Sequence, residues 1–188
     1  MKDKMILQPD ISLEDNLLAS SGRFAIKYRD VGHPEWKLHF AKKNLIVNSA
    51  RKVMAHVISG DENWFINQLR LGGTNDVTAF QMLNPDPPTI TDTNVVYTDN
   101  LFTRDSTDQI VGNPAWSVSY PNTPNETSVL FSITVGRNEA NLTGDQPTVY
   151  LCSGLFTDSG NFMFSSQSFP VIAKTTQREL LIEWEIRF

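Results

Sequence analysis

The last nine residues of the chain alternate between apolar and polar side chains. Apolar residues occupy every second position from Leu180 to Phe188, and glutamate or arginine occupies most of the positions between them. A period of two places one set of side chains in a core and the other in water. The pattern therefore predicts a terminal β-strand that is tied into a sheet, with Trp184, Ile186 and Phe188 in the core.

The same period of two occurs twice near the start of the chain. Residues 23–30 alternate apolar positions with charges, and residues 36–40 repeat the alternation. The segment between them, DVGHPE, is rich in residues that form turns. Together the two stretches predict a β-hairpin.

Residues 43–60 carry the one convincing helical pattern. Their apolar residues recur at spacings of four, seven and eight and form a single stripe. Asn44 or Asn48 is available as an N-cap, and Gly60 follows where a C-terminal cap is expected. We predict a helix over about residues 44–59, with Val53 and Val57 in the core.

Most of the remaining chain is typical of short strands. Phe162 and Phe164 lie in an aromatic-rich stretch after the predicted tight turn Asp158-Ser159-Gly160, and we expect both rings in the core. Short strands separated by turn clusters, with a single helix, predict a mainly β protein, an antiparallel β-sandwich with one packed α-helix. Alternation or apolar runs predict these further strands at 65–73, 115–120, 128–136, 148–156 and 162–172.

Two regions show neither the period of two typical of a strand nor the spacing typical of a helix. Residues 1–20 mix charges with apolar residues and are expected to form an extended N-terminal arm. Residues from about 74 to 112 are rich in proline and aspartate, which predicts a long loop region with one short strand at most. Its aspartates do not have the spacing of an EF-hand, so no calcium site is expected. We expect residues 21–188 to form a single domain.

Charge and hydropathy narrow the choice of partner. The chain of 188 residues has 16 basic and 21 acidic side chains, a net charge of −5, and no clustered run of lysine or arginine. Proteins that bind nucleic acid through its phosphates usually present a clustered basic face, so we expect no nucleic-acid partner. Because no apolar stretch approaches about 20 residues, no membrane span is expected, and the N-terminus does not resemble a signal peptide.

The sequence contains no pattern typical of a catalytic, cofactor or metal site. Cys152 is the only cysteine and lies in an apolar stretch, so we expect a buried, inert thiol. Three histidines occur without metal-ligand spacing, and His56 is expected to be a solvated residue on the helix surface. Glu183 and Glu185 share one face of the terminal strand, which is typical of a solvated sheet. We therefore predict that the protein is not an enzyme and needs no cofactor.

Two stretches together resemble a family of small bacteriophage virion proteins. Residues 43–61 and 66–76 are similar to its Asn-Leu-Ile/Val-x-Asn helix start, small-residue helix and strand ending in glycine, with Ala50 where members commonly have glycine. Residues 153–188 are similar to its C-terminal signature. In this chain the signature residues are Gly154-Leu155-Phe156, Asp158-Ser159-Gly160, Phe162, Phe164, Phe169-Pro170, Lys174-Thr175, Trp184 and Ile186.

The resemblance implies an architecture and a context rather than a reaction. It implies a structural protein of the virion, assembled in the bacterial cytoplasm as an oligomer, which contacts itself and other virion proteins on the tail, baseplate, collar or fibre base. One alternative is a capsid decoration protein.

Another alternative is a carbohydrate-binding module of a tail fibre, in which an exposed Trp64 or Trp116 would stack on a host glycan. A glycan-degrading tail-fibre enzyme ranks last, because no paired-acid motif accompanies these tryptophans. Residues 77–147 match no part of the family pattern.

Overall fold

A computed structural model describes most of the chain after residue 21. The predicted arm, most of the predicted loop region and the predicted turn Asp158-Ser159-Gly160 lie outside the described residues. The description covers residues 22–46, 49–61, 64–74, 95–104, 106–107, 109–122, 124–141, 147–157 and 162–188.

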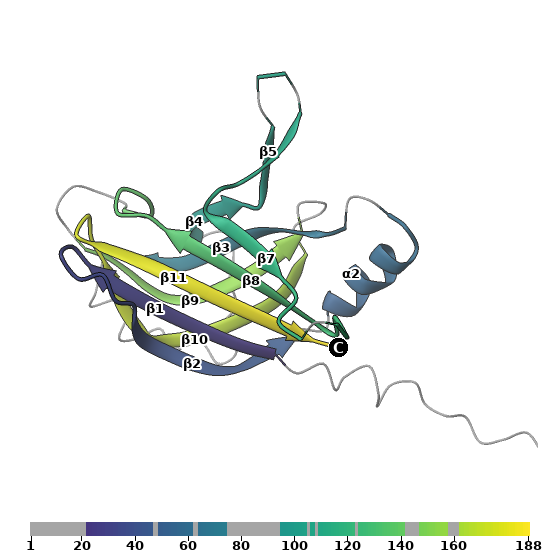
Figure 1. Ribbon diagram of the computed structural model, residues 1–188, viewed down its shortest axis with the longest axis horizontal. Coiled ribbons are helices and arrows are strands. Elements are labelled where there is room, and N and C mark those ends of the chain that lie inside the picture. Colours follow the sequence, from purple (N-terminus) through teal and green to yellow (C-terminus); the bar gives the residue numbers. More distant parts are fainter. Residues whose placement is uncertain are drawn as a thin grey trace, which may run out of the picture.

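Strands dominate the described part of the chain, and a single helix, α2, follows the second strand (Figure 1). The mainly β class predicted from the sequence is confirmed. In chain order the elements are β1 (Gly22–Asp30), β2 (Lys37–Ile46), α2 (Ser49–Ile58), β3 (Ile66–Thr74), β4 (Val95–Asn100), β5 (Phe102–Arg104), β6 (Ile110–Gly112), β7 (Trp116–Ser119), β8 (Ser128–Val135), β9 (Thr148–Thr157), β10 (Met163–Lys174) and β11 (Arg178–Arg187).

Nine of these strands form one antiparallel sheet that folds back on itself as two layers. The strand order is β4-β3-β9-β10-β2-β1-β11-β8-β7, and β2 belongs to both layers. From Lys37 to Asn44 it pairs with β1, whereas Leu45 and Ile46 pair with β10. In Figure 1 the layer of β1, β11, β8 and β7 crosses in front of the layer of β10, β9 and β3. The predicted sandwich is therefore built by one strand that passes between its layers.

Aromatic rings join the two layers at the centre of the molecule. Phe24 of β1 stacks on Phe169 of β10 at 5.6 Å between ring centroids, and meets Trp184 of β11 edge to face at 4.8 Å. β1 is distant in sequence from β10 and β11, so the contacts of Phe24 join segments that are far apart in the chain. The buried aliphatic residues around these rings include Ile26, Leu69, Leu71, Ile133, Leu155, Ile172, Leu180, Ile182 and Ile186.

The predicted strand at the C-terminus is confirmed, but one of its predicted core residues is wrong. β11 lies between β1 and β8, and Trp184 and Ile186 are fully buried. Phe188, in contrast, is 65% exposed. Pairing ends at Arg187, so the side chain of Phe188 extends beyond the sheet, although its backbone N–H donates to Thr127 O at 2.8 Å.

The helix is shorter than predicted, because Lys43 to Ile46 continue β2 instead of beginning the helix. Backbone pairing with β1 and then with β10 satisfies these residues in the sheet and overrides their helical spacing. Val53 is buried as predicted. The predicted core position of Val57 is wrong, since its side chain is 49% exposed. Figure 1 shows the reason: α2 runs away from the end of the sandwich, so its last turn has no sheet beneath it.

The region predicted as a loop contains three strands, so that prediction is wrong in its described part. β4 pairs with β3 at the edge of the sheet, while β5 and β6 pair only with each other. We call β5 and β6 the ribbon. Figure 1 shows that the ribbon projects away from the sandwich. The strands escaped prediction because each is stabilised by a partner rather than by its own alternation.

Candidate interaction site at the projecting ribbon

The half-buried carboxylate of Asp99 fastens the base of the ribbon to the sandwich. Asp99 comes from the end of β4, and its Oδ2 accepts a hydrogen bond from Trp116 Nε1 at 3.1 Å. Its Oδ1 accepts a second hydrogen bond, from Asn113 Nδ2 at 2.5 Å. The same amide nitrogen also donates to Asn100 O at 2.9 Å. Asp99 and Asn100, which precede the ribbon, are thereby tied to Asn113 and Trp116, which follow it.

Hydrogen bonds to the neighbouring strand β3 reinforce this base. The backbone carbonyl of Asn67 in β3 accepts a hydrogen bond from the Leu101 N–H at 2.6 Å. Its side-chain Oδ1 accepts a second hydrogen bond from the Phe102 N–H at 3.3 Å. Asn113 N–H then donates to Leu101 O at 2.8 Å, directly across the entry to the ribbon. The ribbon therefore leaves the sandwich from a fixed base.

Burial raises the pKa of the Asp99 carboxyl above its usual value, and the hydrogen bond from Trp116 opposes the rise. Both side-chain partners are N–H donors, so both of their hydrogen bonds need acceptor oxygens. Protonation of Asp99 would convert one acceptor oxygen into a donor and remove one of these bonds. The network is therefore complete only while Asp99 is ionised.

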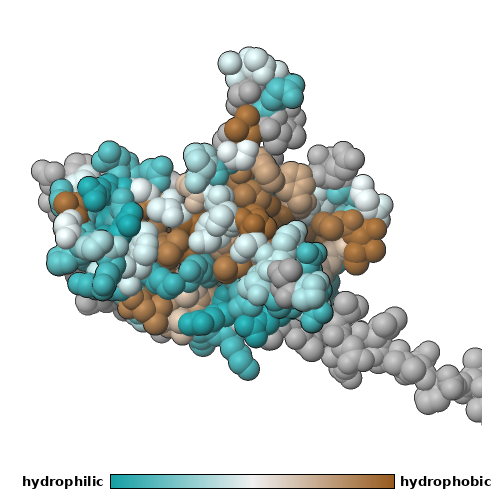
Figure 2. Space-filling model, in the orientation of Figure 1, coloured by the Kyte–Doolittle hydropathy of each residue, from teal (hydrophilic) through white to brown (hydrophobic). Residues whose placement is uncertain are grey.

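Apolar side chains are exposed beside this base. Phe65 is 43% exposed and Phe102 is 38% exposed, and their rings meet edge to face at 5.7 Å. Figure 2 shows hydrophobic surface where the ribbon meets the sandwich, and a second hydrophobic area over α2, where Val57 and Ile58 are exposed. Clustered exposed apolar groups on a protein surface often mark a site of interaction. The pair Phe65 and Phe102, which we call the aromatic pair, is the centre of the candidate site.

The two tryptophans predicted as exposed stacking surfaces are both buried, so that prediction is wrong. Trp64 is 9% exposed, and its ring lies between His56, at 3.8 Å, and Phe162, at 4.8 Å. Trp116 is 7% exposed and packs edge to face against Phe131. Neither ring is open to a sugar, because neighbours brought in by the fold occupy the faces that a sugar would need.

The stack on Trp64 also gives His56 and Phe162 their roles. The expected solvated His56 instead covers one face of Trp64, while its Nδ1 lies 3.3 Å from Asp61 Oδ2. Phe162 covers the other face and is partly buried against the core, whereas Phe164 is buried, which confirms the predicted core position of Phe164. The stack fixes the C-terminal half of α2 to the sandwich.

The cysteine and the glutamate pair singled out in the sequence both lie in surroundings typical of a structural role. Cys152 is buried as expected, and burial raises the pKa of its thiol to about 11, which keeps it protonated and unreactive. Glu183 pairs with Lys27 at 2.8 Å, whereas Glu185 pairs with Arg187 at 2.8 Å. The two glutamates thus point to separate partners and do not form a carboxylate pair.

Sequence reasoning assigned no structural role to Lys174, although it is fully buried. Its Nζ donates to Arg137 O at 3.0 Å, to Thr175 O at 3.2 Å and to Asn141 Oδ1 at 3.4 Å. Burial lowers the pKa of this amine to about 8. Because the amine is closed off from solvent and holds three oxygens, it fastens the segment after β8 to the β10–β11 turn.

Within the described ranges, no three metal-ligating side chains gather at one place. No helix in the same ranges has the length and hydropathy to cross a membrane. Comparison with protein-family models, with curated proteins and with solved structures finds no match for this chain. The resemblance to phage virion proteins therefore stays a prediction, and the functional argument depends on the geometry described above.

Proposed function

We propose that this protein is a non-enzymatic structural subunit of a bacteriophage virion, which associates with itself and with neighbouring proteins through the ribbon and the aromatic pair. The observation that carries the proposal is the ribbon itself: a two-stranded element that projects from a sandwich on a fixed base. Its location in the particle is proposed to be the tail, baseplate, collar or fibre base.

The ribbon is too short to be stable by itself. Each of its strands has three residues, and an isolated two-stranded hairpin is marginally stable in water. Here its base is held by Asp99, Asn67 and Asn113, while Phe102 on its first strand stays partly exposed. A neighbouring subunit that covers Phe65 and Phe102 would bury apolar surface at about 25 cal/mol for each Å². Such a contact would stabilise both the ribbon and the assembly.

The proposal that the protein is not an enzyme is supported by the structural contacts of its reactive side chains. Within the described residues, the thiol of Cys152 is buried, Lys174 is enclosed, and Glu183 and Glu185 form surface ion pairs. The virion context is supported by the resemblance stated for residues 43–76 and 153–188. Carbohydrate binding is not proposed, because it depended on an exposed Trp64 or Trp116.

The test replaces the aromatic pair and follows the subunit into particles. Phe65→Ser/Phe102→Ser is expected to leave the denaturation midpoint within a few degrees of wild type, and to abolish incorporation into phage particles. Incorporation is measured by mass spectrometry and by antibody-gold labelling of purified particles. Leu38→Ser/Val171→Ser is the matched control, since both residues are exposed on strands outside the ribbon.

The position of the gold label separates the candidates. Label on the tail, collar or fibres supports the proposal, and label spread over the head indicates a capsid decoration protein instead. Absence of the wild-type chain from particles would overturn the virion context. Normal incorporation of the Phe65→Ser/Phe102→Ser variant would overturn the role of the ribbon.

A further inference from the structure

Ion pairs connect β1 and β11 along the outer face of the first layer. Arg29 pairs with Glu179, and Lys27 pairs with Glu183 at 2.8 Å. Arg29 lies directly opposite Glu179 in the strand register, whereas Lys27 lies opposite Leu181 and reaches Glu183 diagonally. We call this arrangement the charge ladder.

The charge ladder breaks at its last step. Arg23 of β1 lies directly opposite Glu185 of β11 in the strand register. Glu185 nevertheless gives both of its carboxylate oxygens to Arg187 of its own strand, at 2.8 and 3.0 Å. On its other side Arg23 lies directly opposite Lys43 of β2. Like charges at directly opposite positions of two strands repel each other and destabilise the pair.

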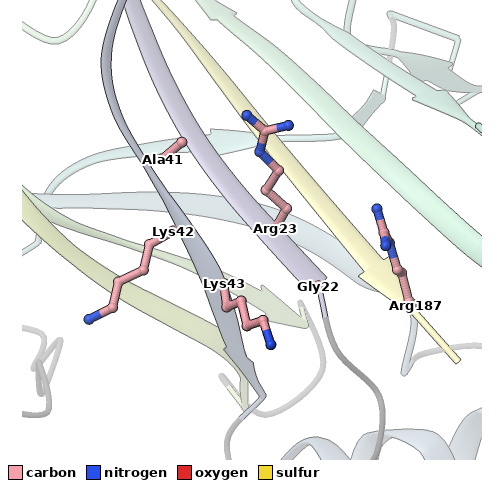
Figure 3. Close-up of a pocket in the computed structure, with 6 residues that line it drawn as sticks. All are labelled: Gly22, Arg23, Ala41, Lys42, Lys43 and Arg187. Atoms are coloured by element: carbon pink, nitrogen blue, oxygen red, sulfur yellow. The ribbon is translucent and has the colours of Figure 1, made fainter.

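This repulsion is not relieved within the described chain. Arg23, Lys42 and Lys43 are exposed, and no acidic residue of the described ranges forms an ion pair with any of them. With Gly22, Ala41 and Arg187 they line an open cleft of about 390 Å³. In Figure 3 the side chains of Arg23 and Arg187 extend on one side of the cleft, and Lys42 and Lys43 leave β2 in different directions around it. Arg23 and Lys43 share one face of the sheet and place two cations without an ion-pair partner at one side of the cleft, whereas Lys42 extends from the opposite face of β2.

We propose that this basic cleft binds the acidic N-terminal segment of a second copy of the chain, residues 10–15. The proposal rests on the self-association included in the proposed function. This segment carries Asp10, Glu14 and Asp15, and the whole stretch from residue 5 to residue 21 contains no lysine or arginine. The three carboxylates of the segment are therefore opposite in charge to Arg23 and Lys43, the two cations that share one face at the cleft.

Position in the chain favours exchange between two copies. Gly22 lines the cleft and the acidic segment precedes it in the sequence, so every copy carries both the segment and the cleft that accepts it. Two copies related by a two-fold axis can therefore exchange segments reciprocally, with the same contact made twice. A nucleic acid fits the site less well, because a net charge of −5 repels a polyanion and the two cations Arg23 and Lys43 do not form a track along a phosphate backbone.

The experiment swaps the charges of cleft and segment in the full chain. Sedimentation equilibrium at low ionic strength measures self-association of wild type, of Arg23→Glu/Lys43→Glu, of Asp10→Lys/Glu14→Lys/Asp15→Lys, and of the chain that combines all five changes. The cleft variant and the segment variant are each expected to weaken association by about tenfold or more, since each gives the cleft and the segment charges of the same sign. The combined chain is expected to recover most of the lost affinity, because its charges are complementary again.

Two further measurements sharpen the result. Lys37→Glu/Arg51→Glu alters the net charge by the same amount at exposed sites outside the cleft, and is expected to leave association nearly unchanged. An equimolar mixture of the cleft variant and the segment variant is expected to associate. The acidic segment of the first then meets the basic cleft of the second, and the basic segment of the second meets the acidic cleft of the first.

The possible failures are distinguishable. If wild type stays monomeric at every concentration, both the segment exchange and the proposed self-association are overturned. If wild type associates but the cleft and segment variants do so equally well, the segment exchange alone is overturned. Loss of association without recovery in the combined chain also overturns it, as does an effect equal to that of the control variant.

Discussion

At the scale of single residues, Trp184 shows how packing rather than hydrogen bonding holds the two layers together. Its ring is fully buried and meets Phe24 edge to face, and Phe24 in turn stacks on Phe169 of the other layer. Within the described part of the chain, the indole N–H of Trp184 has no hydrogen-bond partner. An unpaired buried donor has an energetic cost, so the contribution of this residue to stability comes from its contacts.

Replacement of Trp184 by alanine is therefore expected to lower the free energy of unfolding by about 3–5 kcal/mol, the range for loss of a large aromatic side chain from a core. Chemical denaturation followed by circular dichroism measures the change. Phe188→Ala is the matched control on the same segment, because Phe188 is 65% exposed and should change stability little. A similar small effect at both positions would contradict the packing described for Trp184.

Lys174 leads to a prediction about pH. Its amine has a pKa of about 8 in the folded protein instead of the ordinary 10.5, because burial disfavours the charged form. Between these two pH values the unfolded chain binds the proton more tightly than the folded chain does, so the contribution of Lys174 to stability rises with pH. Below pH 8 both states are protonated, and this contribution is constant at its lowest value.

The test compares wild type with Lys174→Met, which cannot titrate at this position. The variant loses the hydrogen bonds of the amine at every pH, but the difference in free energy of unfolding should move in favour of wild type as the pH rises from 8 to 10. Over the whole window from about 8 to 10.5 the change corresponds to about 3 kcal/mol. A difference that is independent of pH, or one that falls, would show that the amine is not desolvated as described.

At the scale of elements, the ribbon depends on a few polar side chains that belong to other strands. Asp99 from β4, Asn67 from β3 and Trp116 from β7 meet at its base. Because the ribbon has only three residues in each strand, the energy that orders it comes from this base. Local order in the ribbon should therefore respond to changes in the base more strongly than the sandwich does.

Trp116→Phe tests this dependence, since it keeps an aromatic ring against Phe131 but removes the hydrogen bond to Asp99. We expect a loss of about 1–3 kcal/mol, the range for a hydrogen bond to a charged group. The pKa of Asp99 should rise further, because the Trp116 hydrogen bond is the main interaction that lowers it. Carboxyl NMR titration measures the pKa, and hydrogen exchange at the Phe102 amide measures the order of the ribbon.

Ser117→Ala is the control, because Ser117 is exposed on the same strand. If the Phe102 amide exchanges at the wild-type rate in Trp116→Phe, the base does not order the ribbon.

At the scale of the whole molecule, an acidic chain presents two surfaces with different chemistry. The aromatic pair at the ribbon base is apolar, and the cleft at the ends of β1, β2 and β11 is basic. Apolar contact provides most of the affinity in protein association, while charged contact provides orientation and a dependence on salt. An assembly that uses both surfaces would be tight and also specific in its geometry.

Deletion of residues 1–15 separates folding from assembly. The described strands begin at Gly22, so the shortened chain is expected to melt cooperatively at the wild-type temperature. Its self-association should weaken about as much as in the Arg23→Glu/Lys43→Glu variant, because each change removes one side of the same contact. A large loss of thermal stability would instead mean that these residues contribute to the fold of a single copy.

The local pattern of the sequence determined the class of the fold and most of its strands. Period-two alternation predicted β1, β8 and β11, and the unbroken apolar run predicted a central β9. These predictions hold because alternation is a property of the strand itself: once a strand lies in a sheet, every second side chain enters the core. The structural surroundings of Cys152 could also be predicted, since an isolated cysteine in an apolar strand is usually buried.

The tertiary structure alone decided where elements end and which aromatic rings face solvent. Lys43 to Ile46 became strand because β1 and β10 offered backbone partners, and β4, β5 and β6 formed for the same reason. Trp64 and Trp116 are covered by rings from distant segments, whereas Phe188 has nothing above it. The base of the ribbon and the basic cleft are equally non-local. Burial and pairing depend on neighbours that are far away in sequence, and a local pattern contains no information about them.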